Sequence, residues 1–502
     1  MQTLHDLLGG FAVAMQPEML FYCVVGSLIG TLVGVLPGLG PAAAMAILIP
    51  FATGLSPTAA IIMLAAIYYG AMYGGSTTSI LLNIPGESAS VVTCIDGYEM
   101  ARQGRAGAAL GIAAISSFIA GTLGLFGLVF MAPLLVDVAL KFGPPEYFGL
   151  LLLGLTVAVS LAGASLVKGL VAAITGLLIA AIGIDPQSGI ARYTFGTVDM
   201  MAGFDVIVVV IGLFAVTEVF VNAESPAFQI LQTKIGSVWP SRADFRRSSG
   251  AIGRGSAVGF VLGLIPGVAP AVVTFVSYDI EKRISKRPEA FGQGAIEGVA
   301  APEGANNACT SAGMVPLFTL GLPTSASLAV LLGALMIHGL QPGPMLFTQQ
   351  KELVWGVIAS MYVGNVMLLI LNLPLIPLWV KLLRVPYPLL GPLILVICVI
   401  AAYGVRSNLF DIWVMLGFGV IGYVMRKLRF PTIPLILALI LGDKLENALR
   451  QSLTISDGSL LIFITRPIAA GFLGLAMAAT LWSLYMRYRS GNNAALASSA
   501  ID

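Results

Sequence analysis

Small polar residues occur beside proline and glycine in two otherwise apolar parts of this sequence. With the neighbouring glycines and prolines, the residues of the first half are Gly75, Ser76, Thr77, Thr78, Asn83, Pro85 and Gly86, and those of the second are Asn306, Asn307, Thr310, Ser311, Pro323, Thr324 and Ser325. A helix that restarts after Pro or Gly presents free N–H groups and the positive end of its dipole, which suits a carboxylate. Hydroxyl and amide side chains add neutral hydrogen bonds, and carbonyls at broken helix ends can coordinate Na⁺. These residue types therefore predict a binding site for a small anion, with helix breaks near them.

No Lys or Arg lies in 74–90 or 306–327. A multiply charged anion would be left poorly neutralised there, so we expect Na⁺ or H⁺ to bind with it and no other cofactor or metal. Glu297 and Glu303 are the ionisable residues nearest to the second stretch. An alternative stays open for each small residue, because such residues also let membrane helices approach closely.

Composition indicates what surrounds these stretches. Of the 502 residues 58% are apolar and 10% are charged, against about 45–50% and about 25% in soluble domains. Apolar runs near the length of about 20 residues that spans a bilayer recur from Leu20 to Met486. We predict an all-α polytopic membrane protein with about 12 transmembrane helices. A net charge of +2 offers no basic field for nucleic acid.

The sequence contains an internal duplication. Gly26-Ser-Leu-Ile-Gly-Thr-Leu-Val-Gly-Val-Leu-Pro37-Gly38-Leu-Gly-Pro41 aligns without a gap to Gly255-Ser-Ala-Val-Gly-Phe-Val-Leu-Gly-Leu-Ile-Pro266-Gly267-Val-Ala-Pro270, 229 residues later. A looser pair follows in Ser76–Ser88 and Thr310–Ser325. Repeats with helices broken at matching places indicate the central site of a transporter. Pro37, Gly38, Pro266 and Gly267 therefore join the candidate substrate or ion site.

Basic residues predict how the two copies are oriented. Arg and Lys flank 255–280 on both sides, whereas no Lys or Arg lies near 26–52. Basic clusters normally stay cytoplasmic. Segment 255–280 should then enter the membrane, turn at Pro266-Gly267 and leave on the same side, as one of two inverted-topology repeats with broken or re-entrant helices. The alternative is a long Pro-kinked spanning helix in each half.

The expected organisation has four parts. Residues 1–233 form the first membrane repeat, 234–254 a basic cytoplasmic connector, 255–490 the second membrane repeat and 491–502 a polar tail. With His5 and His338 far apart, no catalytic triad or metal cluster assembles, and no Walker-type loop is present. We therefore expect no enzymatic activity and an energy source other than ATP bound by this chain.

Several long strings resemble one family, the large membrane subunit of tripartite tricarboxylate transporters, the TctA type. The resemblance covers essentially the whole chain. It rests on Gly34-Val-Leu-Pro-Gly-Leu-Gly-Pro41, Tyr73-Gly-Gly-Ser-Thr-Thr-Ser-Ile-Leu-Leu-Asn-Ile-Pro-Gly-Glu87, Asp96-Gly-Tyr-Glu-Met-Ala-Arg-Gln-Gly-Arg-Ala-Gly107, Gly294-Ala-Ile-Glu-Gly-Val-Ala-Ala-Pro-Glu-Gly-Ala-Asn-Asn307 and Leu320-Gly-Leu-Pro-Thr-Ser325. One departure is Gly304, where the family pattern has Ala.

The resemblance implies a multi-pass protein of the bacterial inner membrane with two partners, a small four-helix membrane subunit and a periplasmic solute-binding protein. It implies import of citrate-like carboxylates driven by an ion gradient. We expect alternating access, with one bundle that carries both broken motifs moving against a scaffold as an elevator. The alternatives are a stand-alone channel or exporter, a permease with a separate ATPase, and, more distantly, an intramembrane enzyme.

Overall fold

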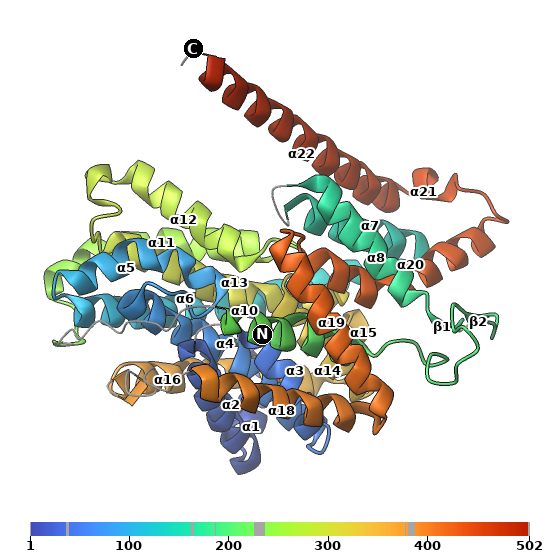
Figure 1. Ribbon diagram of the computed structural model, residues 1–502, viewed down its shortest axis with the longest axis horizontal. Helices are drawn as coiled ribbons and strands as arrows, with labels where there is room; N and C mark the ends of the chain where they lie inside the picture. Colours follow the sequence, from blue (N-terminus) through green and yellow to red (C-terminus); the bar gives the residue numbers. More distant parts are fainter. Residues whose placement is uncertain are drawn as a thin grey trace. The chain divides into compact units, whose positions relative to one another are not determined.

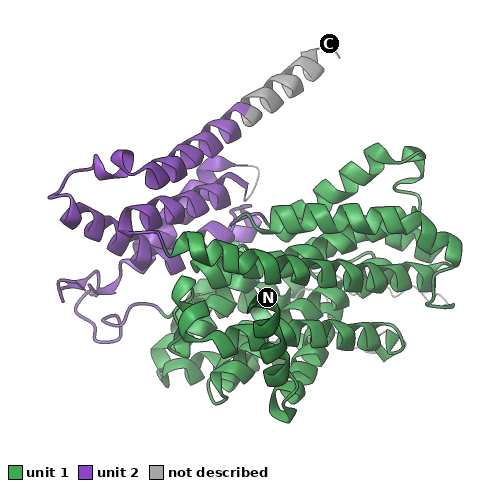
Figure 2. Cartoon of the chain, turned by 180° about the vertical axis from the view of Figure 1, so that it is seen from behind, with its two compact units in different colours: residues 1–140, 205–265, 269–424 green, residues 141–204, 266–268, 425–502 purple. Residues whose placement is uncertain are grey.

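The computed structural model is almost entirely helical (Figure 1). It describes residues 2–36, 40–161, 165–185, 187–224, 236–376, 378–379 and 387–499. The chain divides into two compact units (Figure 2). Unit 1 comprises residues 1–140, 205–265 and 269–424, and unit 2 comprises 141–204, 266–268 and 425–502.

Unit 1 holds most of the helices. They are α1 Gln2–Ala14, α2 Pro17–Val35, α3 Gly40–Ala52, α4 Pro57–Leu82, η1 Ser88–Val91, α5 Thr93–Arg102, α6 Ala106–Ala139, α9 Val206–Val210, η2 Ile211–Val216, α10 Thr217–Ala223, α11 Arg242–Gly263, α12 Pro270–Ile284, η3 Pro288–Ala290, α13 Glu297–Leu320, α14 Ala326–Ile337, α15 Pro344–Gln349, α16 Lys351–Asn372, α18 Tyr387–Arg406 and most of α19 Leu409–Lys427.

Unit 2 is smaller and contains the short β-hairpin. Its elements are α7 Pro144–Leu161, α8 Leu166–Ala180, β1 Gly183–Ile184, β2 Ala191–Arg192, α20 Ile433–Ile455, α21 Ile462–Thr465 and α22 Pro467–Ser499. The strands pair antiparallel, Gly183 with Arg192. Ion pairs fasten this hairpin to α20, since Arg450 contacts Asp185 at 2.9 Å and Arg192 contacts Glu446 at 2.8 Å.

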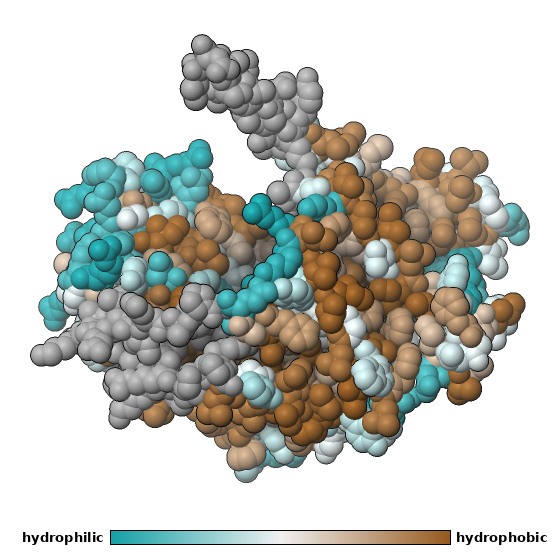
Figure 3. Space-filling model, viewed as in Figure 1, coloured by the Kyte–Doolittle hydropathy of each residue, from teal (hydrophilic) through white to brown (hydrophobic). Residues whose placement is uncertain are grey.

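Many helices are long and apolar enough to cross a membrane. Within the described residues nine segments meet both criteria, and α3, α8 and α14 are shorter apolar helices. Their outer faces are rich in large apolar side chains, such as Phe130 at 63% and Ile400 at 56% exposure, which water would disfavour and lipid would solvate. Figure 3 shows hydrophilic residues gathered at the end of unit 1 where α5, α11 and α12 lie in Figure 1. The chain is a multi-pass membrane protein; the total of twelve crossings stays a prediction.

The duplicated glycines have the same role in both copies. In α2, a Cβ on Gly26, Gly30 or Gly34 would lie 2.3–2.5 Å from a carbonyl oxygen of α4. In α11, a Cβ on Gly255 or Gly259 would lie 2.3 Å from a carbonyl oxygen of α13. The four-residue spacing places these glycines on one helix face, so each copy presses a bare backbone against the helix that carries the polar residues.

The two copies also break at matching places. Helix α2 ends at Val35 and α3 begins at Gly40, while α11 ends at Gly263 and α12 begins at Pro270. In the second copy Gly267 has φ +81°, a conformation that side chains with a Cβ rarely adopt. Arg254 and Glu281, on opposite sides of this break, form an ion pair at 2.7 Å, so α11 and α12 form a hairpin. Entry of this hairpin into the bilayer from one side stays a prediction.

A second pair of breaks follows α4 and α13. Asn83 ends α4 with φ 58°, and Gly321, 238 residues later, ends α13 with φ 69°. Pro85 and Pro323 follow at the same offset, and then Glu87 and Ser325 each cap the next helix with their side chain. The local geometry of the duplication thus extends to the helix after each break.

The compact units do not coincide with the expected repeats. Each unit combines segments of both halves, because 1–140 joins 269–424 in unit 1 and 141–204 joins 425–502 in unit 2. The helices of both broken motifs belong to unit 1, apart from the turn 266–268. The opposite orientation of the two repeats in a membrane is untested.

Candidate functional site

Glu303 is at the centre of the polar residues of unit 1. It lies on α13 and is 1% exposed. Its Oε2 accepts hydrogen bonds from Ser76 of α4 at 2.6 Å and from Ser117 of α6 at 3.4 Å, and its Oε1 accepts one from Thr93 of α5. Three helices, α4, α5 and α6, therefore direct neutral hydroxyl donors at one buried carboxylate on α13.

Glu87 is a second buried carboxylate, contributed by the first half of the chain. Its Oε2 accepts from the backbone N–H of Ala89 at 2.6 Å, which caps η1. The preceding Gly86 brings this loop against the backbone, because a Cβ there would lie 2.1 Å from the carbonyl oxygen of Gly34. The Pro-Gly-Glu sequence thus turns the chain back so that Glu87 points inward, 7% exposed.

Adjacent asparagines on α13 connect the two carboxylates. Asn306 Nδ2 donates to Glu87 Oε1 at 3.3 Å, and Asn307 Nδ2 donates to Ser117 Oγ at 2.7 Å. Asn306 Oδ1 is buried and accepts no hydrogen bond from the described residues. Buried acceptors are nearly always paired, so this oxygen is available to a bound cation or donor.

The two carboxyl groups of the site have no cationic partner in the part of the chain that the structure describes. Among the described residues, neither Glu87 nor Glu303 has a Lys, Arg or His partner. Burial raises the pKa of Glu87, which lies outside the candidate spans, to about 8. No group of three or more His, Cys, Asp or Glu that could hold a metal ion occurs in the described ranges.

Two small cavities adjoin this cluster. One is lined by Ser76, Thr77, Ser117 and Asn372 and the other by Asn307, Thr310, Ser311 and Asn365, among others; each is ≈ 10 Å³. A single water needs about 10–15 Å³ by this measure. Neither of these two cavities admits an organic acid without movement of the helices.

Asp96 fixes the segment that leads into α13. The carboxylate is fully buried, and its Oδ1 accepts from the backbone N–H groups of Gly292, Gly294 and Ala295, each at 2.8 Å. Its Oδ2 accepts from the hydroxyl of Tyr278 at 2.8 Å. Asp96 lies one turn after Thr93 on α5, so the same helix supports Glu303 and anchors the start of α13.

The predicted site residues fall into four groups. Ser76, Asn306 and Asn307 meet at the carboxylate cluster, with Thr77 lining its cavity. Gly75 and Thr78 lie beside it on α4, and Gly86 positions Glu87. Thr310 donates to the Asn306 carbonyl of its own helix, and Ser311 donates to the Asn307 carbonyl and to the Gly121 carbonyl of α6 at 3.2 Å. Both line the second cavity.

The remaining predicted residues lie at the breaks. Asn83 is exposed at the end of α4, with Pro85 next to it, and Pro323, Thr324 and Ser325 precede α14. Pro266 and Gly267 lie at the turn between α11 and α12. Pro37 and Gly38 lie outside the described residues. None of these makes a hydrogen bond to Glu87 or Glu303 among the described contacts.

The expectation of helix breaks beside Gly74–Ser79 and within Asn306–Ser311 is wrong. Both segments lie inside unbroken helices, α4 and α13. The reason is packing: a Cβ on Gly74 would lie 2.3 Å from the carbonyl oxygen of Thr31, so this glycine serves close contact with α2. The observed breaks are at Asn83–Glu87 and Gly321–Ser325.

The predicted set lacked Glu87, Thr93 and Ser117 and gave Glu303 no role. A signal for Glu303 was present in the sequence, since it precedes Asn307 by four residues and shares its helix face. Glu87 follows the Pro-Gly break directly. Nothing in the sequence places Ser117 near either carboxylate, because the contact depends on how α6 packs against α13.

The fold and site define a class: a multi-pass helical membrane protein whose two related halves enclose a buried polar site. Comparison with known families assigns it further. Residues 20–437 match the family described as "Tripartite tricarboxylate transporter TctA family", and the chain belongs to that family. It is therefore a membrane component of a tripartite system for tricarboxylate transport.

Two similar proteins come from Agrobacterium vitis. One, named "Uncharacterized 52.8 kDa protein in TAR-I ttuC' 3'region", is 46% identical over 98% of both chains. The other, named "Uncharacterized protein in TAR-II ttuC' 3'region", is 44% identical over 46% of this chain and 96% of its own length. No solved structure matches this sequence.

Proposed function

We propose that this protein is the subunit of a secondary transporter that imports small organic carboxylates, such as citrate and other tricarboxylates, driven by a gradient of Na⁺ or H⁺. One observation carries the proposal: two buried carboxylates from the two halves, Glu87 and Glu303, are held by neutral donors alone. Family membership supports the substrate class.

The charge of the site explains why a cation must take part. A buried carboxylate without a cationic partner is costly, and ionisable groups inside a membrane protein are functional candidates. An anionic substrate that approaches Glu87 and Glu303 is repelled unless their charge is removed. A proton on a carboxylate, or Na⁺ held by carboxylate, hydroxyl and the Asn306 Oδ1 oxygen, removes it. Cation and substrate then bind together, which is symport.

Alternating access follows from the size of the site. The adjoining cavities hold about one water each, so the cluster must open to admit a carboxylate. A channel would instead need a continuous polar pore. Both broken motifs have their helices in unit 1, which supports one moving bundle, and we propose that it moves as an elevator against a scaffold.

The partners follow from the tripartite family. We propose that a periplasmic solute-binding protein delivers the carboxylate and that a small four-helix membrane subunit completes the complex in the bacterial cytoplasmic membrane. This chain supplies the path and the cation site.

Uptake by proteoliposomes tests the proposal. The complex is reconstituted with its binding protein and offered a panel of labelled organic acids, with external Na⁺ present or replaced by choline, and with or without a pH gradient. We expect accumulation of at least one di- or tricarboxylate that collapses when one of the two gradients is removed. Accumulation that needs neither gradient, or that needs added ATP, would overturn it.

A further inference from the structure

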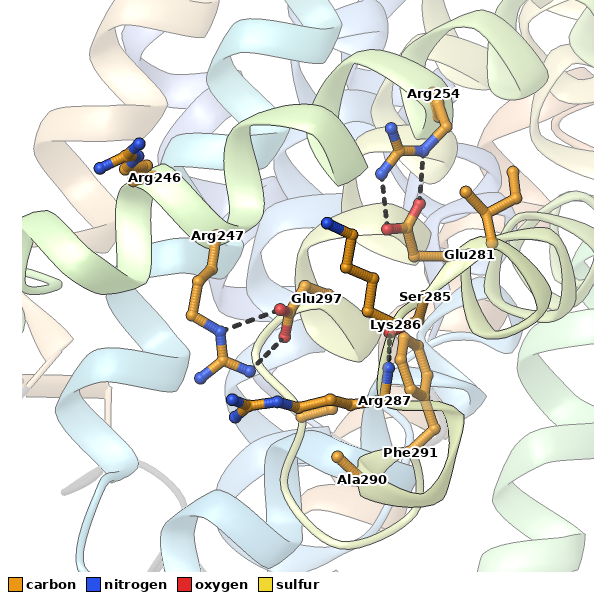
Figure 4. A pocket seen from close by; sticks show the side chains of 12 residues that line it. Arg246, Arg247, Arg254, Glu281, Ser285, Lys286, Arg287, Ala290, Phe291 and Glu297 are labelled. Carbon is orange, nitrogen blue, oxygen red and sulfur yellow. Dashed lines mark hydrogen bonds and ion pairs between the residues drawn. The ribbon is translucent and has the colours of Figure 1, made fainter.

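A second charged site lies in unit 1 at the beginning of α13. Helices α11 and α12, the segment around η3 and the first residue of α13 enclose a pocket of ≈ 590 Å³ (Figure 4). Its charged lining residues are Arg246, Arg247, Arg254, Glu281, Lys286, Arg287 and Glu297. The pocket is distinct from the carboxylate cluster, since neither Glu87 nor Glu303 lines it.

The pocket has an excess of positive charge. Glu281 is paired with Arg254 through two hydrogen bonds of 2.8 and 2.7 Å, and Glu297 with Arg247 through two of 3.0 and 3.1 Å. These pairs use both carboxylates of the pocket. Among the described residues Arg246, Lys286 and Arg287 make no ion pair, which leaves three uncompensated cations.

The walls that carry these cations are fixed. Phe291 is buried and packs edge-on against Tyr278 with 5.4 Å between ring centroids. Asp96 binds three backbone N–H groups of the same segment. Like charges held together on a rigid surface repel one another, and a bound anion removes that repulsion.

The geometry suits a phosphate. Figure 4 shows the guanidinium groups of Arg247 and Arg287 lying close together, with the Lys286 side chain extending between Glu297 and the Arg254–Glu281 pair. Guanidinium groups bind phosphate oxygens through paired hydrogen bonds, and basic pockets on membrane proteins bind lipid head groups. Ile284, also part of the lining, is 57% exposed and offers an apolar surface beside the cations.

We propose that this pocket binds a phosphate group, supplied either by the head group of an anionic phospholipid or by soluble phosphate. The ligand holds α11, α12 and the start of α13 together. Glu297, the first residue of α13, lines the pocket, and Glu303 follows it on the same helix by six residues. The inference does not depend on the transported substrate, and its test uses binding alone.

The test compares the full-length protein in nanodiscs of phosphatidylcholine with and without phosphatidylglycerol, and in phosphatidylcholine with added inorganic phosphate. Bound lipid is measured by native mass spectrometry and stability by the unfolding temperature. The variant is Lys286→Gln with Arg287→Gln. Its matched control is Lys282→Gln with Arg283→Gln, which removes two charges from the same helix end outside the pocket lining.

We expect the pocket variant to bind about 25-fold more weakly, since each lost contact between a cation and the phosphate costs about fivefold. The control should stay within about twofold, because Lys282 and Arg283 do not line the pocket. Retained phosphatidylglycerol identifies a lipid head group, and a rise in unfolding temperature with phosphate alone identifies the soluble ion. Lys286→Gln alone carries the same prediction at about fivefold. Three results would overturn the proposal. The wild-type protein could retain no phosphatidylglycerol and show no rise in unfolding temperature with phosphate. The control variant could lose as much binding as the pocket variant, or citrate at the same ionic strength could raise the unfolding temperature as much as phosphate does.

Discussion

Ser76 on α4 donates a hydrogen bond of 2.6 Å to Glu303 on α13, across 227 residues of sequence. Each residue belongs to a different half of the duplicated chain, and each lies on the helix against which the repeated glycines of its own half pack. The contact therefore joins the two copies through the helices that carry the polar residues, α4 and α13. Movement of either copy changes what surrounds the carboxylate.

Replacing Ser76 by Ala should lower ion-driven uptake roughly tenfold, since a hydrogen bond to a charged group contributes about 1.5–3 kcal/mol. Asn307→Ala should lower uptake as well, because Asn307 orients Ser117, another donor to Glu303. Membrane insertion should be unchanged in both. Ser79→Ala is the matched control, because Ser79 is also buried on α4 but bonds to the Gly75 carbonyl. Uptake at the wild-type level in Ser76→Ala and Asn307→Ala would show that the site is misplaced.

Stability should fall with rising pH because of Glu87. Burial raises the pKa of Glu87 to about 8 from an ordinary value of 4.5, so the folded protein holds a proton that the unfolded chain releases. The stability from this group is fully present below pH about 4.5 and is lost as pH rises through about 8. Glu87→Gln should flatten this dependence, since a carboxamide keeps an acceptor for the Ala89 N–H and does not ionise.

The measurement is the unfolding temperature in detergent between about pH 5 and pH 9. Glu289→Gln, on an exposed side chain of η3, is the control and should keep the wild-type slope. An unchanged slope in Glu87→Gln would mean that other groups dominate the pH dependence.

The duplicated glycines predict a stability difference along one helix. A Cβ on Gly259 would lie 2.3 Å from the carbonyl oxygen of Ala305, and both belong to rigid helix backbone. Gly259→Ala should cost about 1–3 kcal/mol of unfolding free energy through overpacking. Gly253→Ala on the same helix meets nothing within 4 Å and should be neutral or stabilising by about 0.5–1 kcal/mol. The measurement is the thermal unfolding of the two variants. Equal unfolding free energies for Gly259→Ala and Gly253→Ala would refute close packing of α11 on α13.

Sequence patterns identified the class of fold and part of the site. Composition and apolar run lengths indicate membrane helices without reference to tertiary structure. The duplicated Gly and Pro positions indicated where α2 and α11 end, because Pro lacks the N–H that continues a helix and Gly tolerates the positive φ of a turn. They also placed Ser76, Asn306 and Asn307 among the candidates.

Other features depend on tertiary contacts that local patterns do not encode. Helix breaks were expected near Gly75 and Ser76, but these residues lie in the continuous helix α4, against which α2 packs closely. Ser117 is one of three hydroxyl residues on the long helix α6, and the sequence does not distinguish it from Ser116 and Thr122; its role appears once α6 packs along α13. Glu303 was expected near the site, yet its partners come from α4, α5 and α6, more than 180 residues away.

The central claim is that the buried carboxylates couple a cation to carboxylate transport, and Glu303→Gln tests it most directly. The measurement is a pair of assays in proteoliposomes that contain the whole complex: gradient-driven accumulation of the labelled acid, and exchange of labelled for unlabelled acid without a gradient. We predict that Glu303→Gln lowers accumulation of the labelled acid by tenfold or more, while exchange persists. The magnitude corresponds to the loss of one charge-assisted contact of about 1.5–3 kcal/mol. Accumulation at the wild-type level, with the same dependence on Na⁺ or pH, would contradict the account.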